Sequence, residues 1–164
     1  MKTEAGGSAS FQAQDLKEHN RFQRSYFERS VKSTMVPVLS PYLERHVDEA
    51  LKFINLRPDE NVLEVGCGMG RYTLLLARRG VPVEGLDLSP VLLDRFRSFN
   101  KGKFEIPLHC SDIQKPVPHL EGKFDVVMGF FTLHHIKDMK NCFAQMARFL
   151  RPGGRIVFLE PNPY

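Results

Sequence analysis

Apolar residues along this chain recur first at helical spacing and then in short buried runs. In the stretch 40–56 they repeat every three or four positions, at Leu43, Val47, Ala50, Leu51 and Ile54. Ser40 can cap that helix, and Pro41 suits its first position. The residues before it, from the eleventh onward, are also rich in helix formers, so an N-terminal helical segment is predicted over 11–57. Residues 1–10 are small and polar, which favours a disordered leader.

From residue 58 onward, short apolar runs alternate with helical patterns. Strands are predicted over 61–67, 81–88, 104–110, 124–131 and 155–161, and helices over 70–80, 89–100 and 140–150. "RPGG" predicts a turn before the last strand. Strands that alternate with helices favour a parallel sheet covered on both faces. The pattern therefore predicts an α/β core over 58–164, with a Rossmann-like, doubly wound parallel sheet.

The composition is that of an ordinary globular protein of 164 residues, with 42% hydrophobic and 26% charged residues. The formal net charge is +4, but basic and acidic residues are mixed along the chain, which argues against a nucleic-acid partner. We find no apolar run near 18 residues and no secretory signal, so we expect no membrane span and a cytoplasmic location. The three cysteines are far apart without a CxxC pair, so no metal site is predicted.

Three glycines at alternate positions, Gly66, Gly68 and Gly70, follow the first predicted strand. Glycine permits positive φ and lets a ligand approach the main chain closely. The dinucleotide fingerprint GxGxxG would need its third glycine where Arg71 stands, and no P-loop lysine follows. Glu64 lies two residues before the loop, on the same strand face as Gly66, where it would repel a pyrophosphate. The loop therefore predicts a ligand that is not rich in phosphate.

Asp87 ends the second predicted strand, at the edge where ligands bind in sheets of this kind. A carboxylate there can accept hydrogen bonds from both hydroxyls of a ribose. Together, the glycine loop and Asp87 indicate an adenosine-type ligand without its phosphates.

Five segments of the chain have the order and spacing of known motifs: "VLEVGCGMG", "VEGLDLSP", "HCSDIQ", "FDVVMGFFTLHHI" and "ARFLRPGGRIVFLEP". They resemble the class I S-adenosylmethionine-dependent methyltransferases, particularly the small-molecule branch that includes the ubiquinone and menaquinone biosynthesis type. The resemblance covers about residues 55–161 and implies S-adenosylmethionine as the cofactor. The family's sheet has seven strands in the order 3-2-1-4-5-7-6. Since the chain ends at Tyr164, the resemblance implies the order 3-2-1-4-5, truncated before strands 6 and 7.

The resemblance also implies cofactor contacts at the carboxyl ends of the predicted strands. The loop around the methionyl part would include Glu64, Gly66, Cys67, Gly68 and Gly70. Asp87 matches the acid that binds the ribose, and Leu88 matches the residue against adenine. Asp112 matches the residue that takes the adenine amino group, with Ile113 as the amide donor beside it. Phe130 matches the position whose main chain meets the cofactor's amino group.

His134 and His135 fall where the resemblance implies that the acceptor approaches. Adjacent residues point in different directions, so at most one is expected to face the pocket, and a purely structural histidine is the main alternative. His135 is the candidate general base, which is needed only when the acceptor atom must lose a proton, as a hydroxyl does. Tyr26 and Phe27 are candidates for a lid over the cofactor, with a plain covering helix as the alternative.

The sequence therefore predicts methyl transfer from S-adenosylmethionine to a small organic acceptor at an O, N or C atom. Two alternatives stay open: a methyltransferase that acts on nucleic acid or protein, and a non-catalytic module that keeps the cofactor fold for binding or assembly. A dinucleotide-dependent oxidoreductase is disfavoured by Arg71 and Glu64. The fifth strand is expected to leave an exposed edge, through which the chain can form a homo-oligomer.

Overall fold

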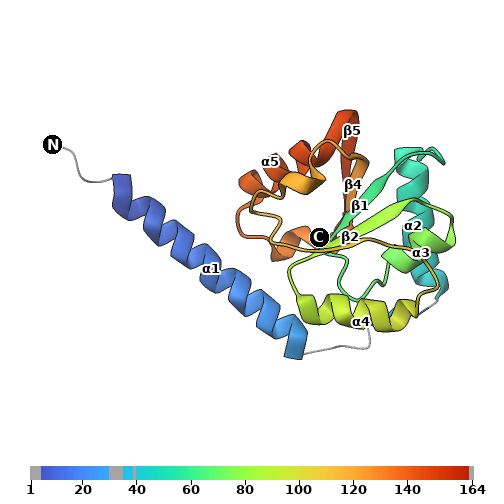
Figure 1. The fold of residues 1–164 in the computed structure, drawn as a ribbon, viewed down its shortest axis with the longest axis horizontal. Coiled ribbons are helices and arrows are strands. Elements are labelled where there is room, and N and C mark those ends of the chain that lie inside the picture. The colour runs from blue at the N-terminus through green and yellow to red at the C-terminus, as the bar shows by residue number, and fades with distance from the viewer. Residues whose placement is uncertain (1–4, 30–34, 39, 163–164) are drawn as a thin grey trace.

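Five parallel strands form the central sheet of the computed structural model, which describes residues 5–29, 35–38 and 40–162 (Figure 1). The strands are β1 Val62–Val65, β2 Val83–Asp87, β3 Leu108–Cys110, β4 Phe124–Phe130 and β5 Leu150–Leu159. Their order, β3-β2-β1-β4-β5, confirms the predicted topology. β1 and β4 are almost entirely buried, because helices cover both faces of the sheet, and their sequences are accordingly largely apolar.

The helices of the described residues are α1 Ala5–Arg29, α2 Pro41–Ile54, α3 Thr73–Arg78, α4 Pro90–Asn100 and α5 Met139–Phe149, with short 3-10 turns η2 at Pro118–Leu120 and η3 at Leu133–His135. Two of them begin as predicted. The hydroxyl of Ser40 accepts a hydrogen bond from the Leu43 main chain, and that of Ser89 from the Leu92 main chain. A proline follows each of these caps, where its missing N–H loses no helical hydrogen bond. No described helix has the length and apolar character that crossing a bilayer requires.

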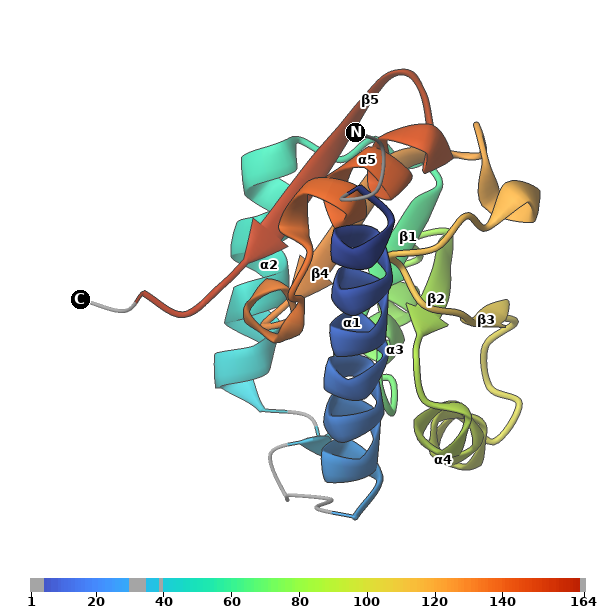
Figure 2. The same cartoon turned by 90° about the vertical axis from the view of Figure 1, so that its left-hand side faces the viewer.

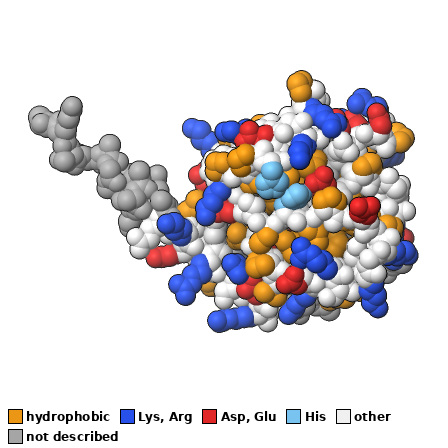
Figure 3. All heavy atoms as spheres, viewed as in Figure 1, with side chains coloured by type: hydrophobic (Ala, Val, Ile, Leu, Met, Phe, Trp, Pro, Cys, Tyr) orange, Lys and Arg blue, Asp and Glu red, His pale blue; other side chains and the backbone are white. Residues whose placement is uncertain are grey.

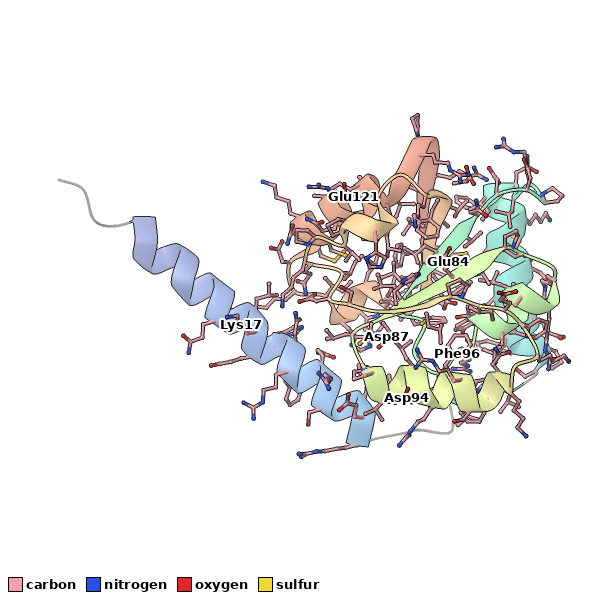
Figure 4. The ribbon with its side chains drawn as sticks, in the orientation of Figure 1. Lys17, Glu84, Asp87, Asp94, Phe96 and Glu121 are labelled. Atoms are coloured by element: carbon pink, nitrogen blue, oxygen red, sulfur yellow. The ribbon has the colours of Figure 1, made fainter. Side chains whose placement is uncertain are left out.

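Separate apolar layers join the helices to the two faces of the sheet. α2 and α3 pack on one face, where Leu76 and Val126 are fully buried. α5 and η2 pack on the other face, where Met146 and Phe149 are fully buried. α4 lies beside β2 and β3, and its Phe96 side chain points into a third buried cluster (Figure 4). The core thus holds the strand ends in fixed positions.

The N-terminal boundary differs from the predicted one. α1 begins at Ala5, whereas the sequence predicted a disordered leader over residues 1–10, of which residues 1–4 lie outside the described residues. The physical reason is cooperativity, because extending an existing helix adds a hydrogen bond for each residue without a new nucleus.

The predicted turn "RPGG" and the third strand also take different forms. β5 pairs with β4 both before and after "RPGG", and the register shifts between Phe124 and Val126. The segment "RPGG" is therefore a bulge within β5 and not a turn before it. β3 is confined to Leu108–Cys110. Pro107, just before it, has no N–H to donate to the ladder, which limits pairing there.

α1 crosses the edge of the sheet at which the parallel strands end. Figure 2 shows it in front of the strands, between α5 and α4. Nε2 of His19 lies 2.9 Å from the main-chain oxygen of His135, and the Ser89 hydroxyl donates to Glu28 over 2.7 Å. α1 therefore forms a wall over the carboxyl ends of the strands.

Candidate functional site

The glycine loop between β1 and α3 has a left-handed backbone at all three alternate glycines. The φ angles of Gly66, Gly68 and Gly70 are 74°, 52° and 85°. A Cβ added to Gly66 would lie 2.4 Å from the Thr132 side chain, and one added to Gly70 would lie 2.9 Å from the Phe96 ring. A Cβ added to Gly68 would meet nothing within 4 Å. Gly70 is thus a packing position, whereas Gly68 borders open space.

The Asp87 carboxylate at the end of β2 is held by main-chain donors. The Gly68 N–H donates to Oδ2 and the Ser89 N–H to Oδ1, each over 2.8 Å. Burial raises the pKa of Asp87, and the main-chain hydrogen bonds from Ser89, Gly68 and Leu88 oppose that rise. Each carboxylate oxygen can accept two hydrogen bonds, so these donors leave capacity for a ligand hydroxyl. Figure 4 shows Asp87 between the sheet and α4.

Glu64 on β1 is a carboxyl group that is only 1% exposed. The Thr73 hydroxyl donates to its Oε2 over 2.5 Å. The pKa of Glu64 is raised to about 7. Burial is the main cause, the hydrogen bond from Thr73 opposes the rise, and the charge of Asp87 adds to it. A buried carboxyl group with such a pKa is stabilised in its ionised form by a cation beside it. The position therefore suits a ligand with a positive group.

Asp112 and Ile113 follow β3 and border the same cavity as the glycine loop. The main-chain N–H of Gln114 donates to Oδ1 of Asp112 over 3.0 Å, and the side-chain amide of Asn20 donates to Oδ2 over 2.9 Å. The Gln114 side chain in turn donates to Oδ1 of Asn20 over 3.2 Å. A primary amide from α1 thus occupies the oxygen at which the family resemblance would put an adenine amino group.

The loop after β4 is fixed by Glu160, a residue that the sequence interpretation missed. Its Oε1 accepts hydrogen bonds from the main chains of Thr132 and Leu133, over 2.7 and 2.8 Å. Its Oε2 lies 2.7 Å from Nδ1 of His134. The loop contains Phe131 at a φ of 55°, which is strained for a bulky residue. The one sequence signal for this role is that Glu160 directly follows the last strand, at the edge where the loop after β4 also lies.

His135 lies in η3 at the border of the cavity, whereas the His134 side chain is exposed. The His135 ring makes an edge contact with the Phe27 ring, with 4.8 Å between the centroids. Burial lowers the pKa of His135, and the neighbouring His134 lowers it further. The imidazole is therefore neutral at neutral pH, which is the form that can accept a proton.

The cavity at this edge has a volume of about 250 Å³ and brings together most of the residues assigned from the sequence. Its lining includes Glu64, Gly66, Cys67, Gly68, Asp87, Leu88, Asp112, Ile113, Phe130 and His135. Gly70 is not part of the lining, because it packs against Phe96. Sequence interpretation did not assign several further lining residues, among them Asn20, Gln23, Arg24, Arg71 and Tyr72. Figure 3 shows histidine and hydrophobic side chains together in the middle of the face in view, with charged side chains around them.

A family model described as a methyltransferase domain matches residues 63–158. The chain belongs to this methyltransferase family. The match spans the sheet from β1 to β5, and so includes the glycine loop, Asp87, Asp112 and the loop after β4. The resemblance found in the sequence is thereby confirmed at the level of the family.

Named relatives and solved structures agree with this assignment. The chain is 33% identical to the demethylmenaquinone methyltransferase of Tropheryma whipplei (strain Twist) over 111 residues. This match covers 68% of the chain and 46% of the relative. The chain is 32% identical over 128 residues to a ubiquinone biosynthesis O-methyltransferase of Idiomarina loihiensis, which covers 77% of the chain and 49% of the relative. The chain thus spans about half the length of these curated relatives.

Among solved structures, a protein of Pyrococcus horikoshii OT3 superposes with a TM-score of 0.71 at 21% identity, over 85% of this chain and 62% of that one. A phosphoethanolamine N-methyltransferase of Haemonchus contortus gives a TM-score of 0.68 at 21% identity, over 82% and 34% of the two chains. These likenesses show the fold.

Proposed function

We propose that this chain binds S-adenosylmethionine and takes part in the transfer of its methyl group to a small organic acceptor. The observation that carries the proposal is the convergence of three carboxyl groups, those of Glu64, Asp87 and Asp112, on one cavity. Three hydrogen-bond acceptors of this kind suit a ligand whose polar groups are donors: an ammonium, a pair of ribose hydroxyls and an adenine amino group. They would repel the pyrophosphate of a dinucleotide.

The residues present fit this cofactor. Gly68 has no side chain, so a ligand can approach its main chain closely. The carboxylate of Asp87 lies beside it and can accept further hydrogen bonds. Glu64 would face the positive methionyl end, and Asp112 and Leu88 the adenine, with Gly66, Cys67, Ile113 and Phe130 as the neighbouring positions. When bound, S-adenosylmethionine supplies a methyl group already activated by the positive charge of its sulfur. The chain's contribution is then to bind, align and exclude water.

The relatives support both the cofactor and the size of the acceptor. The Haemonchus contortus enzyme was crystallised with S-adenosylhomocysteine and phosphomonomethylethanolamine, and a glycopeptide N-methyltransferase of the same fold with sinefungin. The relatives from Tropheryma whipplei and Idiomarina loihiensis are named for demethylmenaquinone and for ubiquinone biosynthesis. These names favour a small organic acceptor over a nucleic acid or a protein.

His135 is the proposed general base for an acceptor that must lose a proton. Its lowered pKa keeps the imidazole neutral, and it lines the cavity close to Phe130 and the end of β4. Because the His135 ring packs edge-on against Phe27 of α1, the same helix that closes the cavity also orients the base.

Calorimetric titration of the purified chain with S-adenosylhomocysteine, with NAD titrated in parallel, tests the proposal. We expect micromolar binding of S-adenosylhomocysteine and no binding of NAD. Tighter binding of NAD would favour an oxidoreductase, and the absence of both would overturn cofactor binding by this chain. Binding without turnover on any acceptor would favour the non-catalytic module.

The outer edge of β5 is the proposed contact between copies of the chain. Within the described residues, β5 pairs with β4 on one side only. Phe53 of α2, which is 81% exposed, borders a second cavity of about 320 Å³ together with Val157 and Leu159 of β5. Sedimentation at increasing protein concentration, compared between the native chain and Phe53→Ser, checks this contact. The cytoplasmic location stays a prediction from the sequence.

A further inference from the structure

Two histidines face one another at the outer margin of the sheet. His109 belongs to β3, the edge strand, and His119 belongs to η2. Nδ1 of His109 lies 3.3 Å from Nε2 of His119, with 5.3 Å between the ring centroids. Neither residue belongs to the lining of the cavity over the strand ends. Ten residues separate the two histidines in the chain, so no local pattern in the sequence marks the pair.

Glu84 of β2 contacts the opposite nitrogen of the His109 ring. Its Oε2 lies 2.6 Å from Nε2 of His109. Leu86 pairs in register with His109, and Glu84 precedes Leu86 by two residues, so both side chains project from the same face of the sheet as that of His109 (Figure 4). A carboxylate accepts hydrogen bonds, so the proton of the neutral ring lies on Nε2. The lone pair of Nδ1 is then on the side of His119.

Two ring nitrogens at this distance can share a hydrogen or bind one metal ion. Histidine nitrogens bind zinc at about 2.0–2.1 Å, so two of them in a tetrahedral site lie roughly 3.3 Å apart. The distance between His109 and His119 has this value. Metal-binding histidines commonly donate their second N–H to a carboxylate, which orients the ring and makes it a better ligand. Glu84 occupies that position beside His109.

The pair is accessible to an ion from the solvent. The side chain of His109 is 17% exposed, and His119 is an exposed residue. Within the residues that the structure describes, no group of three or more histidine, cysteine or carboxylate side chains could hold a metal ion. Water would therefore complete the coordination, and the ion would exchange with the solvent. Imidazole ligands suit zinc and its neighbours, whereas magnesium prefers oxygen.

We propose that His109 and His119 bind one zinc ion, with Glu84 as the residue that positions the His109 ring. The proposal does not rest on the function proposed above, since the site lies outside the cavity. The ion would join β3 to η2 and so close the segment 109–119, which carries Asp112 and Ile113 of the cavity lining. A metal ion that closes a loop and binds only the folded chain stabilises it.

The test is calorimetric titration of Zn²⁺ into the chain, prepared without a histidine tag and freed of metal with a chelator. Mg²⁺ is titrated in parallel. We expect one zinc ion per chain with micromolar affinity and no binding of Mg²⁺. Zn²⁺ should also raise the temperature of thermal unfolding, because it binds the folded state.

Three variants locate the ion. His119→Ala should remove both the binding and the zinc-dependent rise in unfolding temperature. Glu84→Gln should weaken the affinity by about tenfold or more, as the loss of a carboxylate behind a metal-binding histidine does. His134→Ala is the matched control, because His134 is also an exposed histidine with a carboxylate partner, Glu160 at 2.7 Å, and this variant should keep the full affinity. Thermal unfolding without metal shows that each variant is folded.

The outcomes are distinct. Absence of zinc binding by the native chain overturns the proposal. Equal binding by the native chain and His119→Ala means an adventitious ion only, and loss of binding in His134→Ala places the ion elsewhere, so either result overturns it too. Full affinity in Glu84→Gln contradicts the positioning role of the carboxylate. Binding that requires His119 and is weakened in Glu84→Gln supports the site as described.

Discussion

The side-chain amide of Asn20 donates a hydrogen bond to the carboxylate of Asp112 over 2.9 Å, although 92 residues separate them in the chain. Asn20 belongs to α1, and Asp112 follows β3. The contact closes the cavity at the position proposed for adenine. An arriving adenine amino group would compete with the Asn20 amide at the same oxygen.

Replacing Asn20 with alanine should therefore tighten the binding of S-adenosylhomocysteine. A hydrogen bond to a charged group contributes about 1.5 kcal/mol, so the affinity gain should be roughly tenfold or somewhat less. Calorimetry on Asn20→Ala measures it, with Gln23→Ala as the control, because Gln23 lines the cavity from the same helix. Weaker binding in Asn20→Ala would instead make Asn20 part of the adenine site.

Asp87→Ala should weaken S-adenosylhomocysteine by more than tenfold, a loss of about 1.4 kcal/mol or more. The variant removes the acceptor for the ribose hydroxyls and also frees the N–H groups of Gly68 and Ser89. Asp94→Ala on α4 is a suitable control, because the Asp94 side chain is exposed and pairs only with Arg97 at the surface, whereas Asp87 is buried. Unchanged affinity in Asp87→Ala would remove the ribose assignment.

Two glycines of the same loop should respond differently to alanine. Gly70→Ala places a Cβ 2.9 Å from the buried Phe96 ring, so it should destabilise the fold, by about 2 kcal/mol or more for an overpacked core. Gly68→Ala has room for its Cβ and should cost only about 1 kcal/mol for the left-handed backbone, yet it should impair cofactor binding. Thermal unfolding and calorimetry on both variants check the contrast. Equal effects of the two on stability would contradict it.

The features that could be predicted from the sequence are those with local signals. Ser89 and Pro90 mark a helix start through the chemistry of one turn, and the apolar run at 124–130 marks a buried strand through burial on both faces. Asp87 could be assigned because ligands bind where parallel strands end, at one edge of the sheet, whereas Asp112 was assigned from the family resemblance.

The features that were missed depend on contacts between distant segments. Glu160 holds Thr132 across 28 residues, and Asn20 meets Asp112 across 92, and neither pairing leaves a pattern in the local sequence. α1 has no strand that fixes its place, so its course over the cavity follows only from the assembled fold. The spacing of apolar residues in α1 could not show which of its residues line the cavity.

The pair of Glu60 and Arg155 should stabilise the fold outside the cavity. Arg155 donates to both carboxylate oxygens of Glu60, over 2.8 and 2.7 Å, and the bond lowers the pKa of this buried carboxyl to about 2. Arg155→Met should therefore destabilise the protein at pH 7 by about 3 kcal/mol, since it leaves a buried carboxylate without its main partner. Arg151→Met is the control, because its ion pair with Asp125 is more exposed. Denaturant titration measures both.

The sign of the pH dependence follows from the lowered pKa of Glu60. Its contribution to stability is complete above the unfolded value of 4.5 and is lost as the pH falls toward about 2. The difference between the native chain and Arg155→Met should therefore shrink between pH 5 and pH 3. A difference that stays constant over this range would show that the lost packing of the arginine, and not its charge, accounts for the effect.

Glu64 should give the opposite dependence on pH, because its pKa is raised from 4.5 to about 7. The stability it contributes is complete below 4.5 and is lost as the pH rises through about 7, since the buried carboxyl is then forced to ionise. A positive ligand group beside Glu64 favours the ionised form, so binding of S-adenosylhomocysteine should release a proton at pH 6 and should tighten between pH 6 and pH 8. Calorimetry in buffers of different ionisation enthalpy measures both quantities. Glu64→Gln should bind with an affinity that is nearly independent of pH over this interval. If the variant keeps the full pH dependence, another group, such as the buried Asp87, receives the positive end of the ligand.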